Sequence, residues 1–194
     1  MKTHPDMLPI GAPAPDFQLK GVDGKNYRLE DFGGEIFVFV QGCNHCPYVV
    51  AYLDRLKRLA NDYQDRGVRF VMVNSNDAER YPEDGYEAMQ AFADEHELPF
   101  PYLFDEAQEV AMAYRTFRTP ELLVFDRDRK LAYHGRIDDS AKEPDKVTSQ
   151  DLRDALESLL AGEGVAQPET YAIGCTVKWK EGNEPQVSWT EARG

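Results

Sequence analysis

Residues 35–47 read EIFVFVQGCNHCP, and this stretch decides the fold. Residues 35–40 are a nearly continuous β-branched and aromatic run between Gly34 and Gly42, which predicts a strand buried on both faces. Two cysteines three positions apart follow at once, and a proline comes directly after the second. Because proline is tolerated in a helix only within its first turn, Pro47 predicts that a helix starts at the cysteines.

The pattern that follows predicts a parallel β-α-β unit. From Pro47 to Arg66 apolar residues recur every three or four positions, and charged residues fill the other positions, as in one amphipathic helix. Gly67 is expected to end this helix, and VRFVMVNS, residues 68–75, predicts a second buried strand. A strand, a helix and a strand in this order predict a right-handed crossover between parallel strands.

Further elements are expected on both sides of this unit. FQLK and NYRLEDF, joined by the turn VDGK, predict a hairpin at residues 17–32. After the second strand we expect a helix at 85–96, a short strand at 100–105, a helix at 106–117, a hairpin of strands at 121–126 and 130–137, and a helix at 149–164 with Ser149 as N-cap and Gly162 as terminator.

These elements predict an α/β fold of three layers, with a central mixed β-sheet flanked by helices and an N-terminal β-hairpin extension. We expect one domain over residues 1–194, with its core at about 8–162. The C-terminal segment 163–194 is expected to be an extended tail that packs back on the core, because it is rich in apolar residues, among them Trp179 and Trp189.

Composition excludes some functions and favours others. The net charge of −13 argues against a nucleic-acid partner, because binding to nucleic acids relies on Lys and Arg to neutralise phosphates. No apolar run has the length of a signal-peptide core or a membrane span, so a soluble cytoplasmic protein is expected. A reducing cytosol does not maintain structural disulfides, which makes the close pair Cys43 and Cys46 either catalytic or metal-binding.

The two cysteines have the arrangement of a redox dithiol. Cys43 is expected where a strand ends and a helix starts, and there backbone amides favour a thiolate, lowering a thiol pKa from about 8.5 to roughly 3.5–7.5. Cys46, one helical turn later, is within reach to resolve a mixed disulfide. His45 either supplies positive charge or a hydrogen bond to the Cys43 thiolate, or is an exposed loop residue with little effect.

The chain resembles the thioredoxin superfamily, in the branch grouped with alkyl hydroperoxide reductase and thiol-specific antioxidant proteins. The resemblance covers residues 8–180 and is carried by APDFQL, LEDF, CNHCPYV, VNSND, YPEDGYEAM, TPELLVFD, YHGRIDDS and GCTVKWK. It implies a thioredoxin-like fold and a thiol-disulfide oxidoreductase with Cys43 as nucleophile and Cys46 as resolving thiol. It also implies that Thr119 and Pro120 form a cis-proline turn apposed to the dithiol.

The same resemblance suggests the substrate class, and the chain departs from the patterns of related proteins at two places. A disulfide-containing protein or a small thiol or disulfide is the expected substrate, without a cofactor, for a monomer or homodimer. Thioredoxins have a buried acid six residues before the first cysteine, where this chain has Phe37, so Asp77 at the end of the second strand is our substitute. Asn76 is expected either to satisfy backbone groups beside the site or to make a turn. The peroxiredoxin pattern Pro-x-x-x-Thr-x-x-Cys is not legible before Cys43.

Several alternatives remain open from the sequence. A thiol peroxidase is the main alternative function, and a non-catalytic binding module of the same fold is another. A zinc site could combine the C-x-x-C pair with Cys175 and His96 or His134, although the second closely spaced ligand pair of most zinc sites is absent and no metal is expected. Cys175 itself is either a buried residue that anchors the tail or a third redox thiol.

Overall fold

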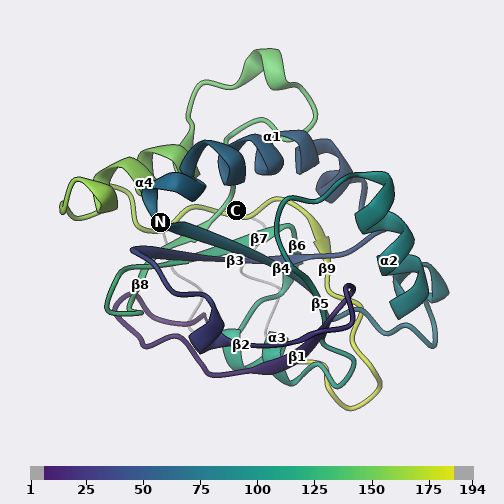
Figure 1. The fold of residues 1–194 in the computed structure, drawn as a ribbon. Coiled ribbons are helices and arrows are strands. Elements are labelled where there is room, and N and C mark those ends of the chain that lie inside the picture. The colour runs from purple at the N-terminus through teal and green to yellow at the C-terminus, as the bar shows by residue number, and fades with distance from the viewer. Residues whose placement is uncertain (1–6, 186–194) are drawn as a thin grey trace.

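The computed structural model describes residues 7–185, so Trp189 lies outside the described residues. The strands are β1 Gln18–Gly21, β2 Asn26–Arg28, β3 Ile36–Gly42, β4 Val68–Asn74, β5 Tyr102–Phe104, β6 Arg118–Thr119, β7 Glu121–Phe125, β8 Leu131–Gly135 and β9 Cys175–Thr176. The α-helices are α1 Pro47–Tyr63, α2 Tyr86–Glu95, α3 Glu109–Tyr114 and α4 Asp151–Leu160. Figure 1 shows their arrangement, which confirms the expected order of elements.

One mixed sheet organises the molecule. Seven strands run in the order β2-β1-β5-β4-β3-β7-β8, with β3 parallel to β4 and β4 parallel to β5. β7 pairs antiparallel with β3, and β8 with β7. The later hairpin therefore joins the predicted parallel unit along β3. The N-terminal hairpin is not separate from this sheet, because β1 pairs antiparallel with β5 and extends it.

Helices cover both faces of the sheet, which confirms the three layers (Figure 1). Val38 and Val40 of β3 face a core that includes residues of α1, α2 and α4, such as Leu56. Phe37 and Phe39 face the opposite core, which includes residues of α3 and the N-terminal segment. All seven residues of β3 are buried, as expected for a strand covered on both sides.

The ends of the helices follow the expected chemistry with one exception. α1 begins at Pro47, passes into a 3-10 turn after Tyr63, and is followed by Gly67 with φ of 82°, a left-handed conformation that glycine adopts at little cost. The prediction of Ser149 as the N-cap of α4 is wrong, since Gln150 occupies that position. Ser149 instead donates its hydroxyl to the Asp151 carboxylate at 2.7 Å.

The C-terminal segment returns to the end of the sheet near the start of α1. β9 pairs antiparallel with β6, with Arg118 opposite Thr176 and Thr119 opposite Cys175. The Val177 amide continues this contact by donating to the Phe117 carbonyl at 2.9 Å. Among the helices of residues 7–185, none combines the length and the apolar character that crossing a bilayer requires.

Candidate active site

The dithiol lies at the junction between β3 and α1. β3 ends at Gly42, Cys43 follows it, and Cys46 is the N-cap residue of α1, directly before Pro47. Both cysteines are free thiols, and only 1% of Cys43 and 0% of Cys46 is exposed. The predicted strand-to-helix junction therefore places both sulfurs under the protein surface.

Thr119 contacts both sulfurs. The peptide bond between Thr119 and Pro120 is cis, as the resemblance implied. The Cys46 thiol donates to the Thr119 carbonyl at 3.0 Å, and the Cys43 sulfur lies 3.6 Å from the Thr119 hydroxyl. β6 thus brings one residue, 73 positions from Cys46, against the pair.

Interaction between the two thiols shifts their pKa values in opposite directions. The Cys43 thiol lowers the pKa of Cys46, with smaller help from Thr119, Cys175 and the Val49 amide. The Cys46 thiol, burial and the nearby Asp84 carboxylate raise the pKa of Cys43. This differs from the expected thiolate at Cys43, because α1 starts one turn later than that residue and its N-cap is Cys46.

Asp84 is the buried acid beside the dithiol, and the sequence reasoning missed it. It ends a 3-10 helix, Pro82–Asp84, and is 0% exposed. Its carboxylate accepts hydrogen bonds from the Asn44 amide at 2.7 Å, the Asn76 side chain at 2.8 Å and the Asn74 side chain at 3.2 Å. These donors stabilise a charge that burial alone would penalise.

Asp77 follows the end of β4, as expected from the sequence. Its carboxylate accepts from the Glu79 amide at 3.2 Å, and its own amide donates to the Lys178 carbonyl at 2.8 Å. Asn76 joins the two environments, since its side chain also accepts from the Lys178 amide at 2.8 Å. The sequence signal that could have found Asp84 is the pair of side-chain amides of Asn74 and Asn76 at the end of β4, because buried amides need a hydrogen-bond acceptor.

His45 faces Asp84. Its Nδ1 pairs with an Asp84 carboxylate oxygen, and its ring stacks on Tyr81 with 5.5 Å between centroids. The Cys43 sulfur, His45 Nδ1 and an Asp84 oxygen lie within 4.8 Å of one another, and three such donors suit a catalytic zinc site.

The zinc partners considered from the sequence lie apart from this cluster. His134 pairs through Nε2 with Glu121 at 2.7 Å, and the His96 ring packs on Phe92 at 4.4 Å. Neither imidazole belongs to the group of donors around Cys43, within the part of the chain that the structure describes.

A second buried acid holds the strand that carries Thr119. The Glu121 carboxylate accepts from the Phe117 amide at 2.6 Å and the Arg118 amide at 2.9 Å, in addition to His134. Burial opposes its ionisation, but the hydrogen bonds from His134 and the two amides outweigh burial and lower the pKa of Glu121. These hydrogen bonds to Glu121 therefore hold the backbone at the start of β6 in place.

Cys175 lies on the other side of Thr119. It is the partly exposed member of the three cysteines, and it packs against the buried cluster that contains the other two. Burial and this contact raise the pKa of Cys175 to about 11. All three cysteines of the chain therefore meet in one cluster.

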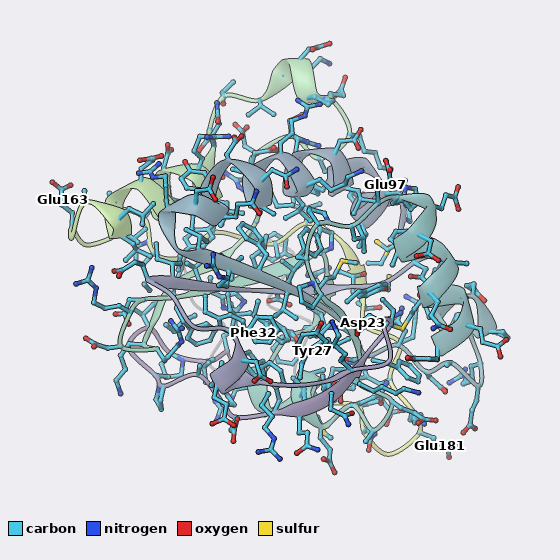
Figure 2. The ribbon with its side chains drawn as sticks, in the orientation of Figure 1. Asp23, Tyr27, Phe32, Glu97, Glu163 and Glu181 are labelled. Carbon is cyan, nitrogen blue, oxygen red and sulfur yellow. The ribbon has the colours of Figure 1, made fainter. Side chains whose placement is uncertain are left out.

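A shallow pocket of about 340 Å³ lies far from this cluster. Tyr27 and Phe32, labelled in Figure 2, line it together with Val68 and Phe100. Val68 is the first residue of β4, whereas the cysteines follow the last residue of the parallel strand β3. The pocket and the dithiol thus lie at opposite ends of these strands, and the dithiol remains the candidate site.

Comparison with known proteins agrees with the fold. The profile of the AhpC/TSA family matches residues 10–134. A thiol-disulfide oxidoreductase ResA from Geobacillus thermodenitrificans is 27% identical over 160 residues, which cover 81% of this chain and 82% of that protein.

Solved structures extend the comparison. An uncharacterized conserved protein from Geobacillus kaustophilus is 47% identical, with a TM-score of 0.85 over 92% of this chain and 96% of that one. The thioredoxin domain of a thiol-disulfide oxidoreductase from Bacteroides vulgatus superposes with a TM-score of 0.57 at 18% identity, covering 66% of this chain and 88% of that one. The last of these likenesses concerns the fold alone, which is thioredoxin-like.

Proposed function

The chain belongs to the AhpC/TSA family, and from this premise we propose that it is a thiol-disulfide oxidoreductase whose working pair is Cys43 and Cys46. One observation carries the proposal: two reduced sulfurs lie against the same residue, Thr119, at a strand-to-helix junction. Such a pair can pass two electrons to a disulfide and become a disulfide itself. The ResA relatives, named thiol-disulfide oxidoreductases, support this assignment.

The substrate class follows from the chemistry of exchange. The pair would act on a disulfide-containing protein or on a small thiol or disulfide, through a mixed disulfide. In the proposed order Cys43 attacks and Cys46 resolves. The proton that Cys43 holds in the resting dithiol must leave first, and we assign its acceptance to Asp84 in place of Asp77.

Reduction of insulin tests the proposal. We expect Cys43→Ser and Cys46→Ser each to abolish turnover with dithiothreitol as electron donor. Val50→Ser is the matched control, since Val50 is 48% exposed on the same helix and should keep wild-type activity. Wild-type rates in both cysteine variants would overturn the proposal. A redox titration of the Cys43–Cys46 pair then gives the direction of electron flow. A reduction potential of about −270 mV would fit a thioredoxin-like reductant, and one of about −120 mV an oxidant.

The alternatives have separate measurements. The C-x-x-C spacing of Cys43 and Cys46 suits exchange through a mixed disulfide, and the peroxiredoxin pattern is not legible before Cys43, which ranks exchange above peroxidase activity. Single-turnover oxidation by hydrogen peroxide at a rate no faster than free cysteine is the expected result, and a fast rate would reverse the ranking. Zinc content of the purified protein tests the donors Cys43, His45 and Asp84, with less than one ion per ten chains expected.

A further inference from the structure

The proposed dithiol has an access problem. Exchange requires an incoming sulfur to approach a reacting sulfur directly, so its rate depends on exposure. Cys43 and Cys46 are 1% and 0% exposed, which leaves no approach for a protein substrate in this conformation. Cys175 is partly exposed and lies on the C-terminal segment that covers the pair.

Thr119 is the common neighbour of the three sulfurs. Its hydroxyl lies 3.6 Å from the Cys43 sulfur, and its carbonyl accepts from Cys46 at 3.0 Å. Cys175 is its partner in the β6–β9 register, and Cys175 packs against the buried cluster that contains Cys43 and Cys46. Cys46 therefore lies between a buried thiol and a partly exposed one.

The segment that carries Cys175 is fixed in place on both sides. Before it, the Gly174 carbonyl accepts from the Arg118 guanidinium at 3.1 Å. After it, the Val177 amide donates to Phe117 at 2.9 Å and the Lys178 amide donates to Asn76 at 2.8 Å. Figure 1 shows β9 beside β6, within the yellow C-terminal part of the described chain. These bonds hold the Cys175 thiol toward Cys46 rather than leaving it on a loose tail.

We infer that Cys175 is a third redox thiol that relays disulfide exchange between the buried Cys43–Cys46 pair and a protein substrate in solvent. The inference rests on the proposed function and adds a residue to it. In the oxidised protein the Cys175 thiolate attacks the Cys46 sulfur, the Cys46–Cys175 bond forms, and the Cys43–Cys46 bond breaks. Cys43 leaves as a thiolate and takes up a proton, while Cys175 has given one to solvent, so no outside oxidant is consumed.

The electrostatics of the cluster agree with this exchange. The Cys46 thiol is one of the groups that raise the pKa of Cys175, and Lys178 and Lys142 act in the opposite direction. Once Cys46 is in a disulfide it carries no charge, and the two lysines then favour the Cys175 thiolate. The relay thiol is thus more acidic in the state in which it must attack.

Trapping of the relay bond is the direct test. Full-length Cys43→Ser protein is oxidised with diamide, digested without reduction and mapped by mass spectrometry. We expect an intramolecular Cys46–Cys175 disulfide in at least half of the molecules. Wild-type protein, treated alike, should give mainly the Cys43–Cys46 disulfide. Intermolecular dimers of Cys43→Ser in place of the internal bond would overturn the relay.

Activity separates the relay from a structural role. We expect Cys175→Ser to lower insulin reduction at least tenfold and to form the Cys43–Cys46 disulfide with diamide as wild type does. Thr176→Ser, on the same strand and exposed, is the control that should keep full activity. Full activity in Cys175→Ser would overturn the relay while leaving the proposed function intact. Failure of wild type to form the Cys43–Cys46 disulfide would instead overturn the proposed function.

Discussion

Replacement of Gly174 by alanine should expose the dithiol to solvent. A Cβ atom at Gly174 would lie 2.2 Å from the Thr119 carbonyl oxygen and 2.7 Å from its carbon. Real Cβ atoms keep at least 3.0 Å, so the two backbones must separate by about 0.8 Å, the difference between 3.0 and 2.2 Å. Both groups are backbone atoms, and neither can rotate away. We therefore expect β9 to lift from β6.

The energy of this separation follows from the bonds it loosens. They are the β6–β9 pairing, the Arg118 bond to Gly174 and the Val177 bond to Phe117, each worth about 1 kcal/mol. Loss of two or three bonds costs about 2–3 kcal/mol and lowers the melting temperature by roughly 4–12 °C. The same energy raises the population of the open state roughly 30-fold to 160-fold.

Alkylation of reduced protein by iodoacetamide, read at Cys46 by mass spectrometry, measures the opening. We expect Gly174→Ala to label at least tenfold faster than wild type. Gly164→Ala is the matched control, because a Cβ there meets nothing within 4 Å on the same segment. If Gly174→Ala folds and Cys46 still reacts at the wild-type rate, the C-terminal segment does not cover the dithiol and the reasoning is refuted.

Three further perturbations test other parts of the structure. Asp84→Asn removes a charge within 4.8 Å of the Cys43 sulfur, an interaction of about 3.5 kcal/mol at an effective dielectric constant of about 20. The pKa of Cys43 should therefore fall in a 240 nm thiolate titration made in a Cys46→Ser background, and an unchanged titration would remove Asp84 from the site. His134→Ala leaves the buried Glu121 carboxylate without its imidazole partner and should cost about 3–5 kcal/mol in urea unfolding, whereas a loss below 1 kcal/mol would mean that the pair does not support β6. Hydrogen bonds from Arg66 and the Tyr63 hydroxyl lower the pKa of Glu157 to about 2. The contribution of Glu157 to stability is therefore present above its unfolded pKa of about 4.3 and is lost as pH falls through 2. Glu157→Gln should flatten the fall in urea midpoint between pH 5 and pH 2, and an equal fall in both proteins would contradict this.

Local patterns predicted the framework around the dithiol. The apolar run of β3 and the period of α1 each describe one element and its buried face, and Pro47 fixed where the helix starts. Those signals lie within a few residues of the features they specify. The parallel unit and the cis bond before Pro120 followed from the order of elements and the resemblance. The cellular compartment and the oligomeric state stay predictions.

Contacts between distant segments could not be read in the same way. The pairing of β1 with β5 joins strands about 80 residues apart, and no period in either strand encodes the partner. The meeting of Cys175 with Thr119 has the same character, since a two-residue strand carries no alternation to recognise. Ser149 was misplaced by one residue because both Ser149 and Gln150 precede the helix, and Ser149 hydrogen-bonds to Asp151 instead of capping a backbone amide.

The position of the buried acid follows from how β3 is packed. Phe37, where thioredoxins have their acid, is 0% exposed among aromatic rings, with 5.3 Å to Phe32 and 5.9 Å to Phe125 between centroids. A carboxylate in that apolar cluster would lack hydrogen-bond donors and would carry the full cost of burial. Asp84 reaches the dithiol from a 3-10 helix instead, where asparagine side chains and the Asn44 backbone amide can stabilise its charge. The apolar run of β3, residues 36–40, and an acid beside Cys43 are compatible because the acid comes from outside the sheet.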